Sequence, residues 1–254
     1  MSIKTPDGIT FFYKGPSPEL GMLPAVFYFA LSAEQTLEMP PYNAPVAFFD
    51  TRCRIFSVTL PAHGESPMEH HAIKAWGEEI AKGSYILEEF MDLVVKAIYF
   101  LVEQNIVDPE AIAFAGLSRG ALIATHMAAK IKEARFLLGF APLTFLNDLE
   151  EYQIYKEHTH VQLRLDRLNL LSLTEKLSHL HGLRFYIGNR DTKVGTDNCY
   201  HFIRKVAEKG YEKKARHFHI ELYITQSIGH KGHGTAPSTF QEGSSWLKQH
   251  LLKE

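Results

Sequence analysis

The sequence predicts a single α/β domain over residues 1–254, with a mostly parallel central sheet and helices on both of its faces. Short apolar runs typical of buried strands alternate with segments of helical periodicity, which favours parallel strands joined by crossover helices. The chain of 254 residues is long enough for one large domain of this class. A Gly-Leu-Ser-Arg-Gly turn at 116–120 also lies between such a strand and such a helix.

The first half of the chain alternates strands with one long helix. The predicted strands are 9–13, 25–30, 55–60 and 111–115. The first follows a Pro-Asp-Gly turn and is expected at the edge of the sheet. Residues 86–103 carry apolar side chains at the spacing of an amphipathic helix. The triplet Asp-Pro-Glu at 108–110 is expected to separate that helix from the strand that follows.

The second half continues the alternation. The predicted strands are 136–140, 183–187 and 218–224, and the predicted helices are 121–130, 196–209 and 238–252. Gly210 is expected to close the helix before it, and Ser238 with Gln241 has the spacing of a capping box that would start the last helix. Between Leu146 and His181 the pattern loosens, so we interpret residues 146–181 as a small cap inserted over the sheet edge.

Composition and charge narrow the classes of function. The formal net charge is -2 with no basic block, so nucleic acid and membrane surfaces are not expected partners. The longest apolar run, 23–31, is far below the roughly 20 residues of a membrane span. No signal peptide is evident at the N-terminus, and Cys53 and Cys199 are the only cysteines, expected as small buried residues. These features favour a cytoplasmic protein without a disulfide framework.

Ser118 is the candidate nucleophile. An apolar strand, a Gly-x-Ser-x-Gly turn and a helix form the context that a nucleophile elbow requires. The turn is tight, so Gly116 and Gly120 leave room where side chains would collide with the neighbouring strand and helix. The alternative is an ordinary turn between strand and helix, as in inactive members of such folds.

A serine hydroxyl needs a base to take its proton and an acid to orient that base. Asp191 lies in the loop after the predicted strand 183–187, where it is the candidate acid; the alternative is a turn residue or helix cap, with Asp197 as a competitor. The loop after the strand 218–224 carries two histidines, each followed by Gly or Lys-Gly. We rank His230 ahead of His233 as the candidate base.

Three segments carry a resemblance to a known superfamily. The loop Thr59–Ser66 resembles a Pro-Gly-His-Gly-x-Ser loop with Ala62 in place of a glycine, residues 187–194 resemble an acid-bearing loop, and residues 107–110 resemble the lead into the elbow strand. Over roughly 23–251 the chain thus resembles an α/β-hydrolase, nearest to the dienelactone hydrolase and prolyl oligopeptidase-like branches.

The resemblance implies a serine hydrolase that cleaves an ester, thioester or amide through an acyl-enzyme intermediate. Such an enzyme is expected to need no cofactor and to act on a small-molecule acyl substrate. A carboxylesterase is the first expectation. The alternatives are a serine peptidase of the prolyl oligopeptidase-like type and an inactive binding protein on the same fold. The oligomeric state stays open.

Backbone N–H groups are expected to hold the oxyanion. Arg119 supplies one candidate, and Leu31 or Ser32 the other, although the family's His-Gly pair is missing after the strand 25–30. Ser32 with Gln35 also has capping-box spacing, so Ser32 has a helix-starting alternative. The side chain of Arg119 either binds an anionic substrate group or forms a structural ion pair.

Fourteen histidines raise the question of a metal site. Close pairs occur at 70–71, at 158 and 160, and at 179 and 181. No third ligand at a matching separation is evident, and a zinc site needs three or four convergent ligands, so no metal is expected. His63 is expected to be structural, because a triad needs only one base.

Overall fold

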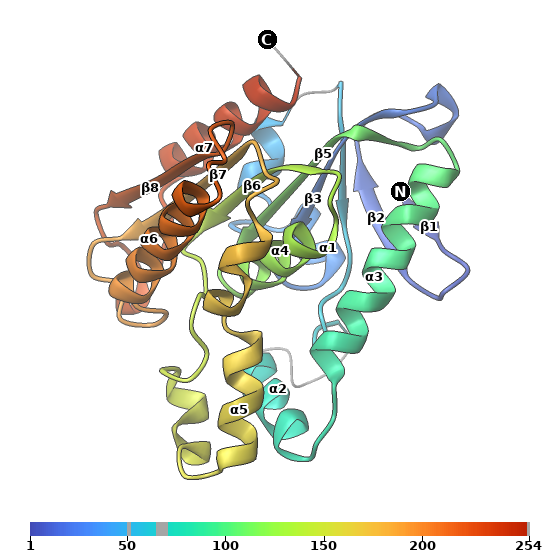
Figure 1. Ribbon diagram of the computed structural model, residues 1–254. Coiled ribbons are helices and arrows are strands. Elements are labelled where there is room, and N and C mark those ends of the chain that lie inside the picture. Colours follow the sequence, from blue (N-terminus) through green and yellow to red (C-terminus); the bar gives the residue numbers. More distant parts are fainter. Residues whose placement is uncertain (50–51, 65–70, 253–254) are drawn as a thin grey trace.

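An eight-stranded sheet forms the centre of the protein in the computed structural model, which describes residues 1–49, 52–64 and 71–252 (Figure 1). The strand order is β1-β2-β4-β3-β5-β6-β7-β8. The antiparallel strands β1 (Ser2–Lys4) and β2 (Thr10–Lys14) form one edge. The parallel strands are β3 (Leu23–Phe29), β4 (Arg54–Ser57), β5 (Val107–Leu117), β6 (Ala134–Phe140), β7 (Gly182–Gly188) and β8 (His219–Thr225). The loops that follow the parallel strands therefore meet at one edge of the sheet, and the predicted fold class is confirmed.

Helices cover both faces because the strands alternate apolar side chains between two cores. One core receives Phe27 and Phe29 with the helices α2 (Ala72–Ala81), α3 (Ile86–Glu103), α4 (Arg119–Lys130) and α6 (Thr196–Glu212). The other receives Val26 and Tyr28 with α1 (Ala33–Glu38) and α7 (Pro237–Leu251). Each fully buried large side chain contributes about 1.5–3 kcal/mol. This two-sided burial explains why β3 has a continuous apolar sequence.

The predicted strands exist, but two details differ. A short strand, β1, precedes β2 and was not predicted. The triplet Asp-Pro-Glu does not interrupt the chain before β5, because β5 runs from Val107 through it to Leu117. The register shifts between Leu23, which pairs with Val107, and Ala25, which pairs with Ile112. This irregularity leaves the proline out of the ladder, where its missing N–H has no cost.

Two helix ends differ from expectation. The helix α6 runs past Gly210 to Glu212, because nothing at Gly210 forces a left-handed backbone. The helix α7 begins at Pro237, with Ala236 as the N-cap residue and no side-chain cap, so the capping box at Ser238 is wrong. Proline at the first helical position lacks only an N–H that has no helical partner there. The helix α3 has the predicted bounds.

The segment 146–181 contains the 3-10 helices η4 (Glu150–Tyr155) and η5 (Leu170–Lys176) around α5 (Thr159–Leu168). It packs mainly against α2, α4 and α6. Arg164 of α5 donates to the carbonyl oxygens of Ile80 and Ser84 at 3.2 and 2.5 Å, which ties α5 to the connection between α2 and α3. Among the described helices, none is both long and apolar enough to cross a bilayer.

Candidate active site

Ser118 lies at the turn between β5 and α4 with a left-handed backbone, φ 55° and ψ -118°. A non-glycine residue rarely adopts this region unless the surrounding structure enforces it. The glycines on either side explain how the turn closes. A Cβ at Gly120 would lie 1.9 Å from the carbonyl oxygen of Phe29 in β3, and one at Gly116 would lie 2.4 Å from the backbone nitrogen of Ala121. The sharp turn predicted for 116–120 is therefore present, and it places Ser118 at the carboxyl edge of the sheet.

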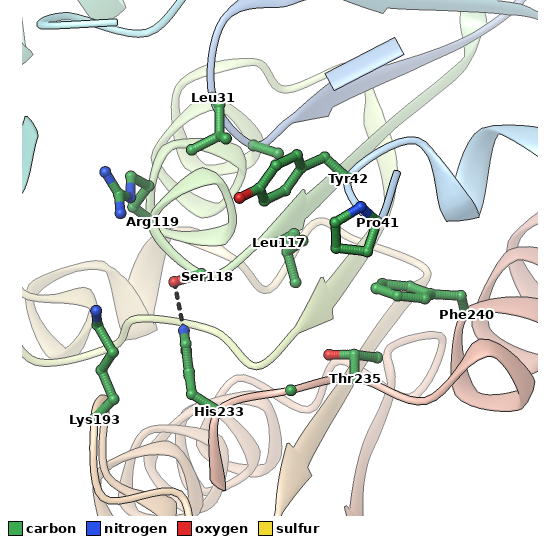
Figure 2. A pocket seen from close by; sticks show the side chains of 12 residues that line it. Leu31, Pro41, Tyr42, Leu117, Ser118, Arg119, Lys193, His233, Thr235 and Phe240 are labelled. Carbon is green, nitrogen blue, oxygen red and sulfur yellow. Dashed lines mark hydrogen bonds between the residues drawn. The ribbon is translucent and has the colours of Figure 1, made fainter. Parts of the chain in front are cut away.

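The hydroxyl of Ser118 contacts an imidazole, and that imidazole contacts a carboxylate. Ser118 Oγ lies 2.8 Å from His233 Nε2 (Figure 2). His233 Nδ1 lies 2.6 Å from Asp191 Oδ2. A carboxylate accepts a hydrogen bond, so His233 carries its proton on Nδ1 and leaves Nε2 to accept the Ser118 proton. Three loops that are distant in the sequence thus form one continuous proton-handling chain.

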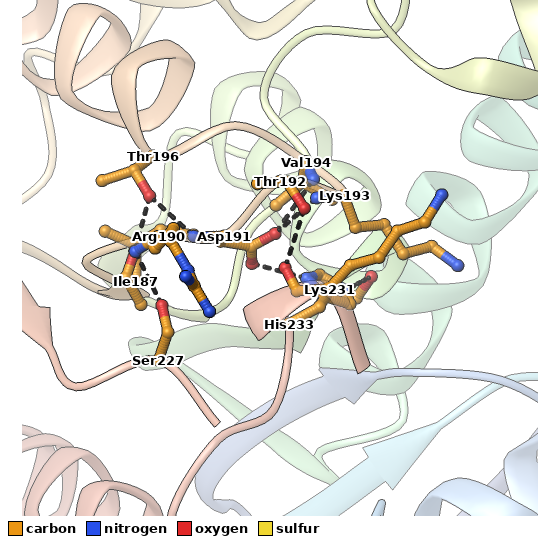
Figure 3. Close-up of polar contacts among 12 residues, drawn as sticks. Ile187, Arg190, Asp191, Thr192, Lys193, Val194, Thr196, Ser227, Lys231 and His233 are labelled. Atoms are coloured by element: carbon orange, nitrogen blue, oxygen red, sulfur yellow. Dashed lines mark hydrogen bonds and ion pairs between the residues drawn. The ribbon is translucent and has the colours of Figure 1, made fainter. Parts of the chain in front are cut away.

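Asp191 is buried and fully hydrogen-bonded (Figure 3). Its Oδ1 accepts from the backbone N–H groups of Lys193 and Val194 at 2.9 and 3.1 Å, while Oδ2 faces His233. Burial by itself raises the pKa of this carboxyl, but the hydrogen bonds from His233 and from the two N–H groups hold the pKa below its ordinary value. Gly195, not Asp191, is the N-cap residue of α6. Asp191 is therefore an ionised partner of His233 that also closes its own turn.

Contacts between two loops hold His233 in place (Figure 3). The backbone N–H and the hydroxyl of Thr192 donate to the carbonyl oxygen of Lys231 at 2.9 and 3.1 Å. The ammonium of Lys231 pairs with Glu150 of η4 at 2.5 Å. A Cβ at Gly232, where φ is 74°, would lie 2.2 Å from the carbonyl oxygen of Arg190, so only glycine fits there. The loop that follows β8 therefore reaches the acid-bearing loop closely enough to bring His233 onto Asp191.

The structure brings the second-ranked histidine, and not the first, to Ser118. His230 begins the 3-10 helix η6 (His230–Gly232) and is exposed, and no contact of its side chain with Ser118 or Asp191 exists. Lys231 and Gly232 have left-handed backbones, and the turn that they form directs the side chain of the next residue, His233, towards Ser118. The structure therefore places His233, the second-ranked candidate, against Ser118.

Of the three expected oxyanion donors, only the N–H of Arg119 has no partner among the residues that the structure describes. The N–H of Arg119 belongs to the first turn of α4, where no helical carbonyl is available to it. Leu31 N–H donates to Thr36 Oγ1 at 3.0 Å, and Ser32 N–H faces Gln35 Oε1 at 3.4 Å in a complete capping box. Leu31 and Ser32 thus start α1 and do not offer free donors in this structure.

A cavity of about 220 Å³ opens above Ser118 and His233. Its lining residues are Ala30, Leu31, Pro41, Tyr42, Leu117, Ser118, Arg119, Lys193, His233, Gly234, Thr235 and Phe240. Figure 2 shows Arg119 and Lys193 on one side of the Ser118–His233 pair and Pro41, Leu117 and Phe240 on the other. The sequence motifs did not indicate Tyr42, Thr235 or Phe240, because each lies outside a motif and reaches the cavity through tertiary packing. Lys193 lies inside the acid-bearing loop 187–194, but its position in that loop gave no signal that it lines the cavity.

His63 lies beside the cavity lining and not in the proton-handling chain. Its Nδ1 lies 2.9 Å from the carbonyl oxygen of Pro61, and its Nε2 lies 3.2 Å from Arg119 Nη1. Glu65 and Ser66, which end the Thr59–Ser66 motif, lie outside the described residues, as does His70. Within 1–49, 52–64 and 71–252, no group of three or more histidine, cysteine, aspartate or glutamate residues converges as a metal site would. Cys53 and Cys199 are both buried.

Solved structures share this arrangement of sheet and helices. An esterase of Pyrococcus furiosus is similar at 18% identity and a TM-score of 0.62, over 100% of this chain and 90% of its own. An α/β-hydrolase of a Penicillium species is similar at 14% identity and a TM-score of 0.62, over 99% of this chain and 98% of its own. An acylaminoacyl peptidase of Pyrococcus horikoshii is similar at 12% identity and a TM-score of 0.66, over 99% of this chain and 40% of its own.

The comparisons establish the fold. The chain spans about two fifths of the acylaminoacyl peptidase and nearly all of the other two proteins. No protein-family model matches the sequence. No curated protein matches it either. At identities of 12–18%, structural likeness shows architecture, and the protein has the α/β-hydrolase fold that its motifs predicted.

Proposed function

We propose that this protein is a serine hydrolase that cleaves an ester, thioester or amide bond through an acyl-enzyme, and that it acts as a carboxylesterase on a small molecule. The observation that carries the proposal is the pair of contacts from Ser118 Oγ to His233 Nε2 at 2.8 Å and from His233 Nδ1 to Asp191 Oδ2 at 2.6 Å. Both distances are those of strong hydrogen bonds, and the order of the groups is that of a catalytic triad.

Each group has one role in this mechanism. Ser118 Oγ attacks the acyl carbon while its proton passes to His233 Nε2, and the acyl oxygen becomes an oxyanion. The N–H of Arg119 donates to that oxyanion; the loss of one such donor in a known hole costs about 2.7–4 kcal/mol. The oxyanion collapses, and the leaving group departs with the proton from His233. Water then attacks the acyl-enzyme and gives a proton to His233 Nε2. The bond between the acyl carbon and Ser118 Oγ breaks, His233 returns the proton to Ser118 Oγ, and the carboxylic acid product leaves.

Asp191 keeps its negative charge throughout this cycle. Its depressed pKa means that the carboxylate stays ionised at neutral pH and stabilises the imidazolium form of His233. It also fixes the tautomer in which Nε2 faces Ser118. These steps use side chains, backbone N–H groups and water, with no further group.

The cavity favours an ester over a peptide substrate. It is small, at about 220 Å³, and none of its described lining residues is acidic. A peptide whose N-terminus lies on the side of Arg119 and Lys193 would bring a protonated amine close to two cations, where like charges repel. An ester has no such charge, and its leaving group needs less assistance than an amine. The distinction between esterase and peptidase activity rests on these two features.

Labelling with a fluorophosphonate probe tests the proposal. Wild-type protein should become labelled at Ser118 and should cleave p-nitrophenyl butyrate, whereas Ser118→Ala should do neither. Alanine p-nitroanilide should be cleaved far more slowly than the ester. Faster cleavage of the anilide would support the peptidase alternative. An intact, folded wild type that neither reacts with the probe nor cleaves either substrate would contradict the proposal and favour an inactive binding protein.

A further inference from the structure

Arg119 places a positive charge at the wall of the cavity, adjacent in sequence to Ser118. The guanidinium is half-buried, and burial lowers its pKa. Electrostatic interactions with Tyr42, Glu151 and Tyr152 raise the pKa and offset part of this effect. Among the described residues no carboxylate forms an ion pair with it. Desolvating a cation without an opposite charge is unfavourable, so the folded protein retains a site that an anion would stabilise.

The contact between Arg119 and His63 positions the cation without neutralising it. The carbonyl oxygen of Pro61 can only accept, so His63 donates from Nδ1 and its Nε2 accepts from Arg119 Nη1 at 3.2 Å. Trp76 packs edge-on against the His63 ring and also donates to the Pro61 oxygen at 2.8 Å. One N–H of the guanidinium is therefore anchored, and its full positive charge remains.

Lys193 brings a second cation to the same side of the cavity (Figure 2). Its backbone N–H donates to Asp191, which fixes the position of the backbone. The carboxylate of Asp191 already accepts hydrogen bonds from His233 and from the N–H groups of the loop, so it is not a free counterion for the Lys193 ammonium. Among the described residues, three acids line the neighbouring groove with Lys193: Asp148, Glu150 and Glu151. Asp148 accepts from Asn198 at 3.0 Å, Glu150 is paired with Lys231 at 2.5 Å, and Glu151 acts on Arg119 only through space. None of these acids lines the cavity itself, whose described lining carries Arg119 and Lys193 and no carboxylate.

The other side of the cavity is mostly apolar, with the hydroxyl of Thr235 as a polar group on it (Figure 2). Pro41, Leu117 and Phe240 lie across the Ser118–His233 pair from the two cations (Figure 2). From this asymmetry, and resting on the hydrolase activity proposed above, we infer that the substrate carries a carboxylate on one side of the scissile bond, bound by Arg119 with Lys193, and an apolar group on the other. A planar guanidinium matches the two oxygens of a carboxylate, which favours this anion.

The test compares esters that differ only in charge. One pair is the p-nitrophenyl monoester of adipic acid and its methyl ester, with the carboxylate in the acyl group. The other pair is 4-carboxyphenyl butyrate and its methyl ester, with the carboxylate in the leaving group. The wild type should prefer the charged member of one pair in kcat/KM. That preference should fall about tenfold or more in Arg119→Gln, because a neutral amide loses the charge-assisted hydrogen bonds that a guanidinium makes to a carboxylate.

Further variants separate recognition from structure. Arg119→Lys keeps the charge and should retain part of the preference, and Lys193→Gln should lower it by a smaller factor. Arg204→Gln, a matched change on exposed α6, should leave it as in the wild type. High salt should weaken the preference, because screening reduces attraction between partly exposed charges.

A binding experiment keeps this inference separate from the proposed activity. Ser118→Ala, which cannot form an acyl-enzyme, should bind adipate by calorimetry, and Ser118→Ala with Arg119→Gln should bind it at least about tenfold more weakly. Absence of hydrolysis with adipate binding intact would overturn only the activity. Hydrolysis with no preference in either ester pair and no adipate binding would overturn the anion site and leave the activity standing.

Discussion

His233 and His230 are three residues apart, and only one of them faces Ser118. His233 is held between two hydrogen-bonding partners at 2.8 and 2.6 Å, while His230 is exposed. We predict that His233→Gln loses esterase kcat by a factor on the order of 10⁴ and loses fluorophosphonate labelling, because Ser118 then has no base. The measurement is a comparison of kcat for p-nitrophenyl butyrate.

His230→Gln is the matched control for this change. It removes the same type of side chain from the same loop without touching the proton-handling chain, so kcat should stay within about twofold of wild type, as expected for a surface change. If His230→Gln abolished activity and His233→Gln did not, the geometry of the loop in solution would have to differ from the one described.

Sequence reasoning could place the candidate nucleophile and the candidate acid at the sheet edge but could not separate the two histidines. Ser118 and Asp191 each follow a strongly apolar strand, so their places at the sheet edge follow from the strand ends. Which histidine reaches Asp191 depends on the left-handed backbones of Lys231 and Gly232. Glycine permits that conformation without requiring it, and a lysine in the sequence gives no signal of a left-handed backbone.

At the scale of elements, the elbow depends on how closely α4 approaches β3. A Cβ at Gly120 would meet the Phe29 carbonyl at 1.9 Å, and a backbone atom cannot rotate away as a side chain can. We predict that Gly120→Ala lowers the free energy of unfolding by about 1–3 kcal/mol or more, as overpacking does, and shifts Ser118 enough to slow its labelling. Urea unfolding and the rate of fluorophosphonate labelling measure the two effects.

Gly210→Ala is a suitable comparison because Gly210 lies inside α6 and an added Cβ would meet only side-chain atoms, at 3.5 and 3.6 Å. Alanine is the better helix former by about 0.5–1 kcal/mol, so this variant should be as stable as wild type or more stable. Equal destabilisation by the two substitutions would argue against the specific collision at the elbow.

The long helix α3 and the buried strands were predictable, because the apolar residues of each element keep one pattern along its whole length. The errors lie where local signals compete. Ser238 and Gln241 have the spacing of a capping box, but Pro237 is already suited to the first helical position, so the helix begins before them. Gly210 resembles a helix stop, but burial of the α6 face continues the helix past it.

At the scale of the whole molecule, the sequence motifs predicted the α/β-hydrolase fold but not the walls of the cavity. The segment 146–181 was recognisable as an insertion, yet its packing against α2, α4 and α6 depends on contacts such as that of Arg164 with the Ser84 carbonyl, 80 residues away. Pro41, Tyr42 and Phe240 reach the cavity from opposite ends of the chain. No local sequence pattern predicts these long-range contacts, because they depend on how whole helices and strands pack against one another.

His126 links α4 to the end of α5 and makes stability depend on pH. It is buried and donates from Nε2 to the carbonyl oxygen of Leu168 at 2.8 Å. Burial lowers the pKa of His126 to about 4 from an ordinary value of 6.5, with only partial compensation from that hydrogen bond. The unfolded chain therefore takes up a proton below pH 6.5 that the folded protein does not accept until about pH 4.

The free energy of unfolding should accordingly fall as the pH drops from 6.5 towards 4, by about 1.4 kcal/mol per pH unit and about 3 kcal/mol in total from this group. His126→Gln keeps an amide donor for Leu168 and cannot titrate, so its stability should fall less over the same interval. Asp191 does not affect the comparison of the two proteins. Its pKa lies below the ordinary 3.8, so its contribution to the free energy of unfolding is lost only at pH values below this interval. Urea unfolding of both proteins at pH 7 and pH 4.5 measures the difference. Parallel losses in the two proteins would mean that His126 accepts a proton in the folded state, and that α5 opens to let it do so.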